Sequence, residues 1–295
     1  RFDRQNPAWL AFLAEEKYYD YAVFKTLKKH FGDRAWSDWD QPYKSCDEAA
    51  VCAFADEHAD EVAFWQFTQF LFLEQWTRLK AYANEKGIAI MGDMPIYVAY
   101  DSLETWKYRS QLFLLSEDGE PSLKAGVPPD AFSEDGQLWG NPVYDWKKLK
   151  GTGYRWWKDR IDYALRLFDV VRIDHFRGFD RFFAIPADAE TAKEGEWLDG
   201  PKEELFKNWG ERAIVAEDLG VIDDGVRALL QKTGYPGMKV FVFGFDGDPE
   251  NDYLPSNIME SNCVAYTGTH DNDTLAGVVL TQDVGINCTE AIVGH

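Results

Sequence analysis

The feature that most constrains this chain is an alternation, after residue 87, of short apolar runs with helical stretches. The apolar runs are residues 88–91, 169–173, 213–216, 238–243 and 263–266. The helical patterns between them are residues 154–168, 201–209 and 223–232. Strands that alternate with helices are typical of parallel strands joined by helical crossovers. We therefore predict an α/β fold of the barrel kind.

Acidic residues follow four of these apolar runs. The pairs that carry them are Gly92-Asp93, Asp174-His175, Glu217-Asp218 and His270-Asp271. In parallel α/β barrels the reactive groups lie just past the carboxyl ends of the strands, so we expect the four ends to converge on one mouth. A single strand-end carboxylate is more often the N-cap of the next helix. Recurrence on several strands, with Arg172 and His270 adjacent, favours a functional site.

The two central carboxylates are predicted to sit in environments that separate their roles. Arg172 and Asp174 are two residues apart on one strand and share a face, whereas Val171 and Ile173 face the outer helices. A guanidinium beside a carboxylate favours the ionised form that a nucleophile requires. Apolar neighbours and a nearby negative charge are expected to keep Glu217 protonated. Cleavage of a glycosidic bond needs such a pair.

The rest of the chain divides into two parts by pattern. Residues 1–87 read as helices, with a capping box at Ser45 and Glu48 and a long helix over residues 62–86 that stops at Gly87. Residues 88–295 carry the barrel strands and helices. Within them, prolines and glycines in residues 117–146 predict an irregular functional loop, which we interpret as a lid.

Composition excludes several classes of partner. Fifty-one acidic against 31 basic residues give a net charge of −20, which repels nucleic acid and anionic lipid. No apolar run is long enough to span a membrane, and four scattered cysteines are typical of a reduced compartment, so we expect a soluble cytoplasmic protein. The 12 Trp, 14 Tyr and 20 Phe are compatible with ligands whose apolar faces stack on rings, such as neutral sugars.

Seven strings of this sequence resemble those of a known family, the 4-α-glucanotransferases called amylomaltase or disproportionating enzyme, which are related to the α-amylases. The strings are GDMPIYV at 92–98, GVPPD at 126–130, GQLWGNP at 136–142, VRIDHFRG at 171–178, AEDLG at 216–220, PGMKV at 236–240 and YTGTHDNDT at 266–274. The match as a whole runs in unbroken order from about Phe2 to Thr274.

The resemblance implies a TIM-type (β/α)8 barrel with a helical N-terminal insertion and a retaining double displacement on α-1,4-glucans. It implies Asp174 as nucleophile, Glu217 as acid/base and Asp271 as transition-state stabiliser. It further implies no cofactor or metal, and substrates that are maltooligosaccharides or starch- or glycogen-derived glucans. The expected substrate contacts are Arg172, His270, Asp93, Asp130, Trp139, Asn141 and Phe243, with the loop 126–142 arching over the cleft.

The sequence departs from the family in three places. Pro255-Ser256-Asn257-Ile258 stands where the family usually reads Pro-His-Asn-Tyr. Similarity fades after Thr274, and residues 284–295 look unlike the family. Family members are longer at both ends, which implies an incomplete barrel here, without the first two strands and the last.

Three other functions are compatible with the same acidic strand ends. An α-glucan hydrolase would use the same carboxylates with water as acceptor. A metal-dependent barrel enzyme would use them to hold magnesium, although Arg172 beside Asp174 would compete with a cation. A non-catalytic glucan-binding fragment would bind sugar without turnover.

Overall fold

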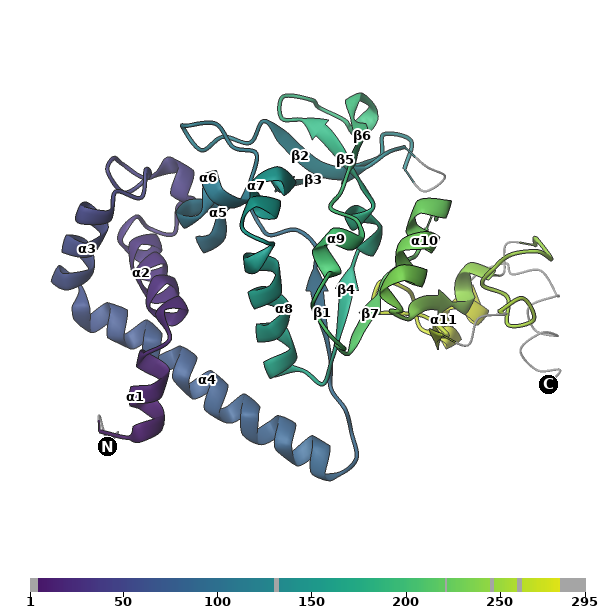
Figure 1. Ribbon diagram of the computed structural model, residues 1–295, viewed down its shortest axis with the longest axis horizontal. Coiled ribbons are helices and arrows are strands. Elements are labelled where there is room, and N and C mark those ends of the chain that lie inside the picture. Colours follow the sequence, from purple (N-terminus) through teal and green to yellow (C-terminus); the bar gives the residue numbers. More distant parts are fainter. Residues whose placement is uncertain (1–4, 130–132, 221, 245–246, 259–261, 282–295) are drawn as a thin grey trace.

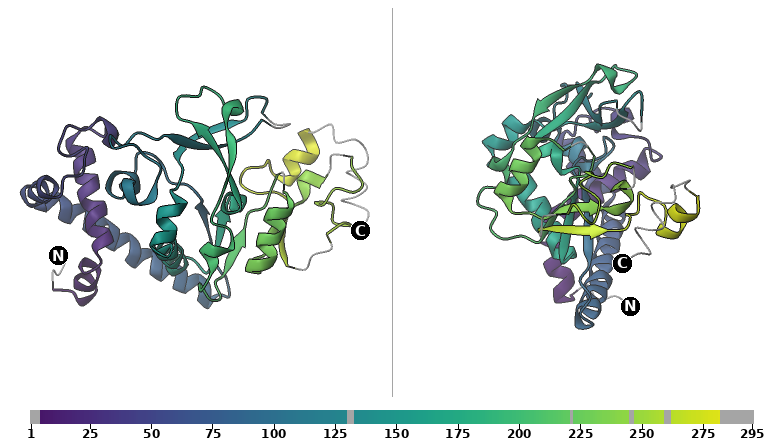
Figure 2. Two further views of the ribbon diagram at one scale, coloured as in Figure 1. Left: turned by 45° about the horizontal axis from the view of Figure 1, so that its top comes forward. Right: turned by 90° about the vertical axis from the view of Figure 1, so that its right-hand side faces the viewer.

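The computed structural model describes residues 5–129, 133–220, 222–244, 247–258 and 262–281 (Figure 1). The helical segment near the N-terminus and the last described helix lie at opposite ends of an elongated molecule, with the strands between them (Figure 2). None of the helices in these ranges combines the length and apolarity that a bilayer span requires.

The first part of the described chain is helical. Its elements are α1 (Pro7–Leu13), α2 (Glu16–His30), the 3-10 turn η1 (Trp36–Asp38), α3 (Glu48–Glu57) and α4 (Ala59–Glu85). The capping box expected at Ser45 was wrong, because the side chain of Asp47 accepts from the amide of Ala50 and is the N-cap of α3. Gly87 follows α4 at a φ of 75°, the left-handed conformation that ends a helix.

The parallel strands form two small sheets. One has the order β1 (Met91–Pro95), β4 (Val170–Asp174), β7 (Ile214–Ala216), and the other pairs β8 (Gly237–Val240) with β9 (Cys263–Tyr266). The amide of Ala216 donates to the carbonyl of Pro236, which joins β7 to the start of β8. Two boundaries differ from expectation: β1 begins three residues later than the run at 88–91, and residues 241–243 belong to the 3-10 turn η4 (Phe241–Gly244).

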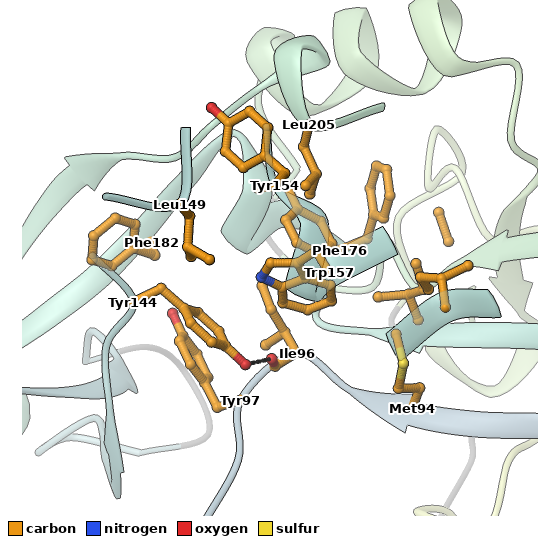
Figure 3. Close-up of a cluster of buried hydrophobic side chains, with 14 of the residues drawn as sticks. Met94, Ile96, Tyr97, Tyr144, Leu149, Tyr154, Trp157, Phe176, Phe182 and Leu205 are labelled. Atoms are coloured by element: carbon orange, nitrogen blue, oxygen red, sulfur yellow. Dashed lines mark hydrogen bonds between the residues drawn. The ribbon is translucent and has the colours of Figure 1, made fainter. Parts of the chain in front are cut away.

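Helices cover the outer side of the parallel strands. They are α8 (Arg155–Leu167), α9 (Glu203–Phe206) and α10 (Asp224–Thr233), and the described chain ends in α11 (Leu275–Thr281). Trp157 and Ile161 of α8, four residues apart, are fully buried and belong to the same core cluster as Val171 and Ile173 of β4. Trp157 is seen within this cluster in Figure 3. Strand, helix and parallel strand therefore repeat as predicted. The described ranges contain no closed barrel of eight strands.

The segment 117–146 is not irregular as expected. It contains β2 (Leu123–Val127) and β3 (Gln137–Pro142), which form an antiparallel sheet in the order β3, β2, β5 (Arg181–Pro186), β6 (Glu196–Asp199). The short helices α5 (Leu103–Lys107), α6 (Arg109–Leu112) and α7 (Trp146–Gly151) flank it, together with the 3-10 turns η2 (Phe176–Phe179) and η3 (Ala192–Glu194). The antiparallel sheet lies beyond the carboxyl ends of β1 and β4 (Figure 1).

A large aromatic core packs between the parallel strands and the antiparallel sheet. Tyr144 stacks on Phe113 and Tyr97, and its hydroxyl donates to the carbonyl of Ile96, just past β1 (Figure 3). Burial raises the pKa of Tyr144, so the hydroxyl stays a donor. The segment that follows β1 is thereby fixed to the antiparallel sheet.

Candidate active site

Arg172 organises the ends of the two central strands. The parallel register places Asp93 of β1 directly opposite Arg172 of β4. The Nη1 atom of Arg172 donates to Oδ2 of Asp93 at 2.6 Å, and its Nη2 atom donates to Oδ1 of Asp174 at 2.9 Å. The side chain of Arg172 is only 8% exposed, whereas both carboxylates are more than 40% exposed. A buried cation therefore contacts two carboxylates that are each partly exposed.

Apolar and charged side chains lie on opposite faces of these strands, as predicted. Val171 and Ile173 are fully buried in the core with α8, on the outer side. Val215 of β7 packs instead with Met238 and Val240 of β8, in a separate apolar cluster. Asp93, Arg172 and Asp174 thus share the inner side of the strands.

The lowering by Arg172 is only one of several contributions to the pKa of Asp174. Burial raises the pKa of Asp174 above its ordinary value, and this exceeds the lowering by Arg172. Asp93 and Asp271 raise the pKa further, while His270 lowers it. Arg172 thus favours the ionised form of Asp174 as expected, but the burial of this carboxyl outweighs its effect.

Glu217 is buried and accepts two backbone hydrogen bonds. Its Oε2 atom accepts from the amide of His175 at 2.6 Å, and its Oε1 atom accepts from the amide of Leu219 at 2.7 Å. Burial raises the pKa of Glu217 to about 7, with a further contribution from the charge of Asp174. Protonation near neutral pH agrees with the expectation from sequence.

Asp271 and His270 approach from the segment after β9. The Nε2 atom of His270 lies 3.4 Å from Oδ1 of Asp271 and 3.8 Å from Oδ2 of Asp93. Both side chains are 67% exposed. A cavity of about 310 Å³ beside them is bordered by Asp93, Arg172, Met238 and His270. Larger hollows of about 640 and 770 Å³ lie elsewhere, along α10 and along α8, and Asp174, Glu217 and Asp271 line none of the three hollows.

The other four predicted contacts differ in their surroundings. Trp139 of β3 is 37% exposed and meets the ring of His175 edge to face at 4.9 Å between centroids, so it lies beside the strand end of Asp174. Asn141 donates to the carbonyl of Val98 and holds the hairpin to the segment after β1. Phe243 packs beside β8 and meets Tyr253 edge to face. Asp130 lies outside the described residues.

Two neighbours of the site were not singled out from the sequence. His175 adopts a left-handed φ of 55°, which directs its amide to Glu217. Burial, with Arg177 nearby, lowers the pKa of His175 to about 3, so its ring is neutral. Met238 contacts Arg172 through its sulfur atom. A non-glycine residue in a left-handed conformation has no local sequence signal, and a methionine in an apolar run reads as core.

The strands are parallel and joined by helical crossovers, and carboxylates at their ends surround a buried arginine. These features define an α/β protein of the TIM-barrel class with an acidic site at the strand ends. The model of the 4-alpha-glucanotransferase family matches residues 1–287, and the chain belongs to that family. The match continues beyond residue 274, where similarity was expected to fade.

Individual relatives agree with this assignment. The chain is 44% identical over 280 residues to the 4-alpha-glucanotransferase of Clostridium butyricum and covers 57% of it. It is 48% identical over 280 residues to that of Thermus thermophilus, of which it covers 56%. These matches include 93% and 92% of this chain. The chain thus spans a little over half the length of these relatives.

Solved structures match as well. An amylomaltase from Streptococcus agalactiae in complex with acarbose has a TM-score of 0.92 and 40% identity, over 98% of this chain and 59% of that one. An amylomaltase from Corynebacterium glutamicum, at 19% identity, has a TM-score of 0.74 over 95% of this chain and 38% of that one, which shows the common fold.

Proposed function

We propose that the protein transfers α-1,4-glucan segments from a donor maltodextrin to the 4-hydroxyl of an acceptor glucan or glucose. The mechanism is a retaining double displacement, with Asp174 as nucleophile, Glu217 as acid/base and Asp271 as stabiliser of the transition state. Membership of the 4-alpha-glucanotransferase family supports the reaction. The substrates are maltooligosaccharides and glucans derived from starch or glycogen.

The observation that carries the proposal is the contrast between Asp174 and Glu217. Asp174 contacts Arg172 and is partly open to solvent, whereas Glu217 is buried and has a pKa of about 7. The amide of the residue that follows Asp174 donates to Glu217, so the two carboxylates belong to one constellation. One can attack while the other still carries a proton, which is the requirement of a retaining glycosidic cleavage.

In the first half-reaction, an oxygen of Asp174 attacks the anomeric carbon and forms a glycosyl ester. The bond from that carbon to the leaving oxygen breaks, and Glu217 gives its proton to that oxygen. The developing positive charge on the sugar ring is met by Asp174 and Asp271. Arg172 stabilises Asp174 as the carboxylate before attack.

In the second half-reaction, Glu217 is a carboxylate and takes the proton of an acceptor hydroxyl. The acceptor oxygen attacks the anomeric carbon and displaces Asp174, which restores both groups. Water competes at about 55 M, so the cleft must exclude it or hold the acceptor well. We assign that task to the hairpin of β2 and β3, since Trp139 of β3 lies at the end of β4 through its contact with His175.

The products formed from maltotriose test the function. Transfer yields glucose together with maltodextrins longer than the substrate, and these are separated by size. Glucose and maltose alone would identify a hydrolase with the same carboxylates. Binding of maltotriose without any product would identify a glucan-binding protein and overturn the proposal.

A further inference from the structure

Arg172 makes a third contact, which the roles proposed above leave unused. Its Nε atom donates to the sulfur of Met238 at 3.3 Å, while Nη1 and Nη2 are engaged by Asp93 and Asp174. Met238 is 2% exposed and lies on β8, packed with Val215 and Val240. The sulfur thus satisfies a donor that is otherwise buried among apolar side chains.

Met238 is itself fixed to the strand end that carries the acid/base. Oδ1 of Asp218, the residue after Glu217, accepts from the amide of Met238 at 2.6 Å. A Cβ atom at Gly237 would lie 2.6 Å from Oδ2 of Asp218, so only glycine permits this close approach. The contacts run continuously from Asp218 through Met238 to Arg172.

We propose that Met238 is a positioning residue for the glucan transfer proposed above, acting through Arg172 on Asp174. The guanidinium group is planar, so an acceptor at Nε sets the direction of the two Nη atoms. With the sulfur in place, the fork points at Asp93 and Asp174 together. A side chain of the same size without an acceptor leaves a buried donor unpaired, and the plane turns to find another partner.

The consequence for Asp174 depends on every charge around it. Arg172 faces Asp174 from its own strand, Asp93 from β1, Glu217 from the segment after β7, and His270 and Asp271 from the segment after β9. Arg172 and His270 lower the pKa of Asp174, whereas Asp93 and Asp271 raise it. Displacing Arg172 removes the main favourable charge, and the nucleophile then ionises only at higher pH.

Met238→Leu tests the proposal, because leucine keeps the volume and removes the acceptor. Met94→Leu is the matched control, since Met94 is a buried methionine on β1, the strand paired with β4, and belongs to the core cluster of Trp157. Turnover of maltotriose is followed against pH in the protein and both variants. We expect Met238→Leu alone to lower kcat by about tenfold with little change in KM. The acid limb of its profile moves to higher pH, and the two variants have similar melting temperatures.

A second pair of variants keeps the test decisive if Met238→Leu folds poorly. Asp218→Asn retains an oxygen for the amide of Met238, whereas Asp218→Ala removes it. We expect the alanine variant to shift the acid limb upward, and the asparagine variant to shift it less. An unchanged acid limb in Met238→Leu, or equal shifts in the Asp218 pair, would overturn the positioning role. Absence of turnover in the unmodified protein would instead overturn the proposed function.

Discussion

Glu217 and Asp174 differ at the level of single contacts. Glu217 is enclosed and titrates at about 7, while Asp174 keeps an open side and a guanidinium partner. The sequence predicts this contrast in outline, because strand alternation places Arg172 beside Asp174. It does not predict that burial raises the pKa of Asp174 as well, since the burial of a strand-end side chain depends on segments that only the fold brings close.

The role of Glu217 as proton donor predicts a selective loss in Glu217→Gln. Turnover of maltotriose should fall by several orders of magnitude in this variant. The decline of activity above a pH of about 7, which is the basic limb of the pH profile, should disappear. That limb arises because activity is lost as Glu217 deprotonates. An α-glucosyl fluoride needs no protonation of its leaving group, so the first half-reaction should survive and release fluoride.

Asp174→Asn is the matched control for that measurement, because it removes the nucleophile. It should fail with maltotriose and with the fluoride alike. Fluoride release from Asp174→Asn at the rate of Glu217→Gln, or near-normal turnover of maltotriose by either variant, would refute the assignment. The two carboxyl groups should lie about 5 to 5.5 Å apart in the working protein, as in retaining enzymes.

Trp139 is exposed enough to meet a ligand and close enough to His175 to serve packing. If it excludes water from the covalent intermediate, Trp139→Ala should lower transfer more than hydrolysis. The ratio of released reducing ends to redistributed chains then rises. Leu138→Ala is the control, since Leu138 is the preceding residue on the same strand and is similarly exposed, at 36%. A parallel fall of both activities, or a loss of thermal stability alone, would make Trp139 part of the scaffold.

At the scale of elements, local pattern predicts what local contacts determine. The strands β4, β7 and β9 and the helices α8 and α10 lie where apolar runs and helical periodicity predict them. The hairpin of β2 and β3 was missed, because its prolines and glycines have low strand propensity. Its inner strand β2 pairs with β5, about 60 residues further along the chain. Such long-range pairing leaves little trace in a single sequence.

Gly126 lets the hairpin pack closely and makes this sheet testable. A Cβ atom there would lie 2.1 Å from the carbonyl oxygen of Gln137 and 2.5 Å from Cδ1 of Ile185. Gly126→Ala should therefore separate β2 from β3 and reduce the free energy of unfolding by about 1 to 3 kcal/mol. Transfer should fall with it. Gly151→Ala, where nothing lies within 4 Å of the added atom, should leave the melting temperature unchanged or slightly higher.

The whole molecule exposes an apolar stripe along α4. Phe64, Phe72, Leu79 and Tyr82 are each about half exposed or more, at 55%, 47%, 54% and 61%. Patches of this kind mark surfaces that bind protein or that associate nonspecifically. We predict that a polypeptide of residues 1–295 binds a hydrophobic dye and self-associates as its concentration rises.

Replacing Phe64, Phe72 and Leu79 by glutamine should reduce both effects while helix content stays constant. Sedimentation and circular dichroism measure the two properties separately. The single replacement Phe64→Gln is the control, and it should reduce dye binding and self-association less than the triple replacement does. A polypeptide that stays monomeric without dye binding at high concentration would contradict the prediction.

The pairing of Asp93 with Arg172 across β1 and β4 makes the active site depend on the register of these two strands. Side chains alternate along a strand, so a slip of one residue would turn Asp93 to the outer side and bring Gly92 or Met94 opposite Arg172. Such a misfolded chain could keep most of its secondary structure and still lose the carboxylate cluster. During refolding, recovery of turnover would then report strand register itself, and it would lag behind the recovery of helical signal.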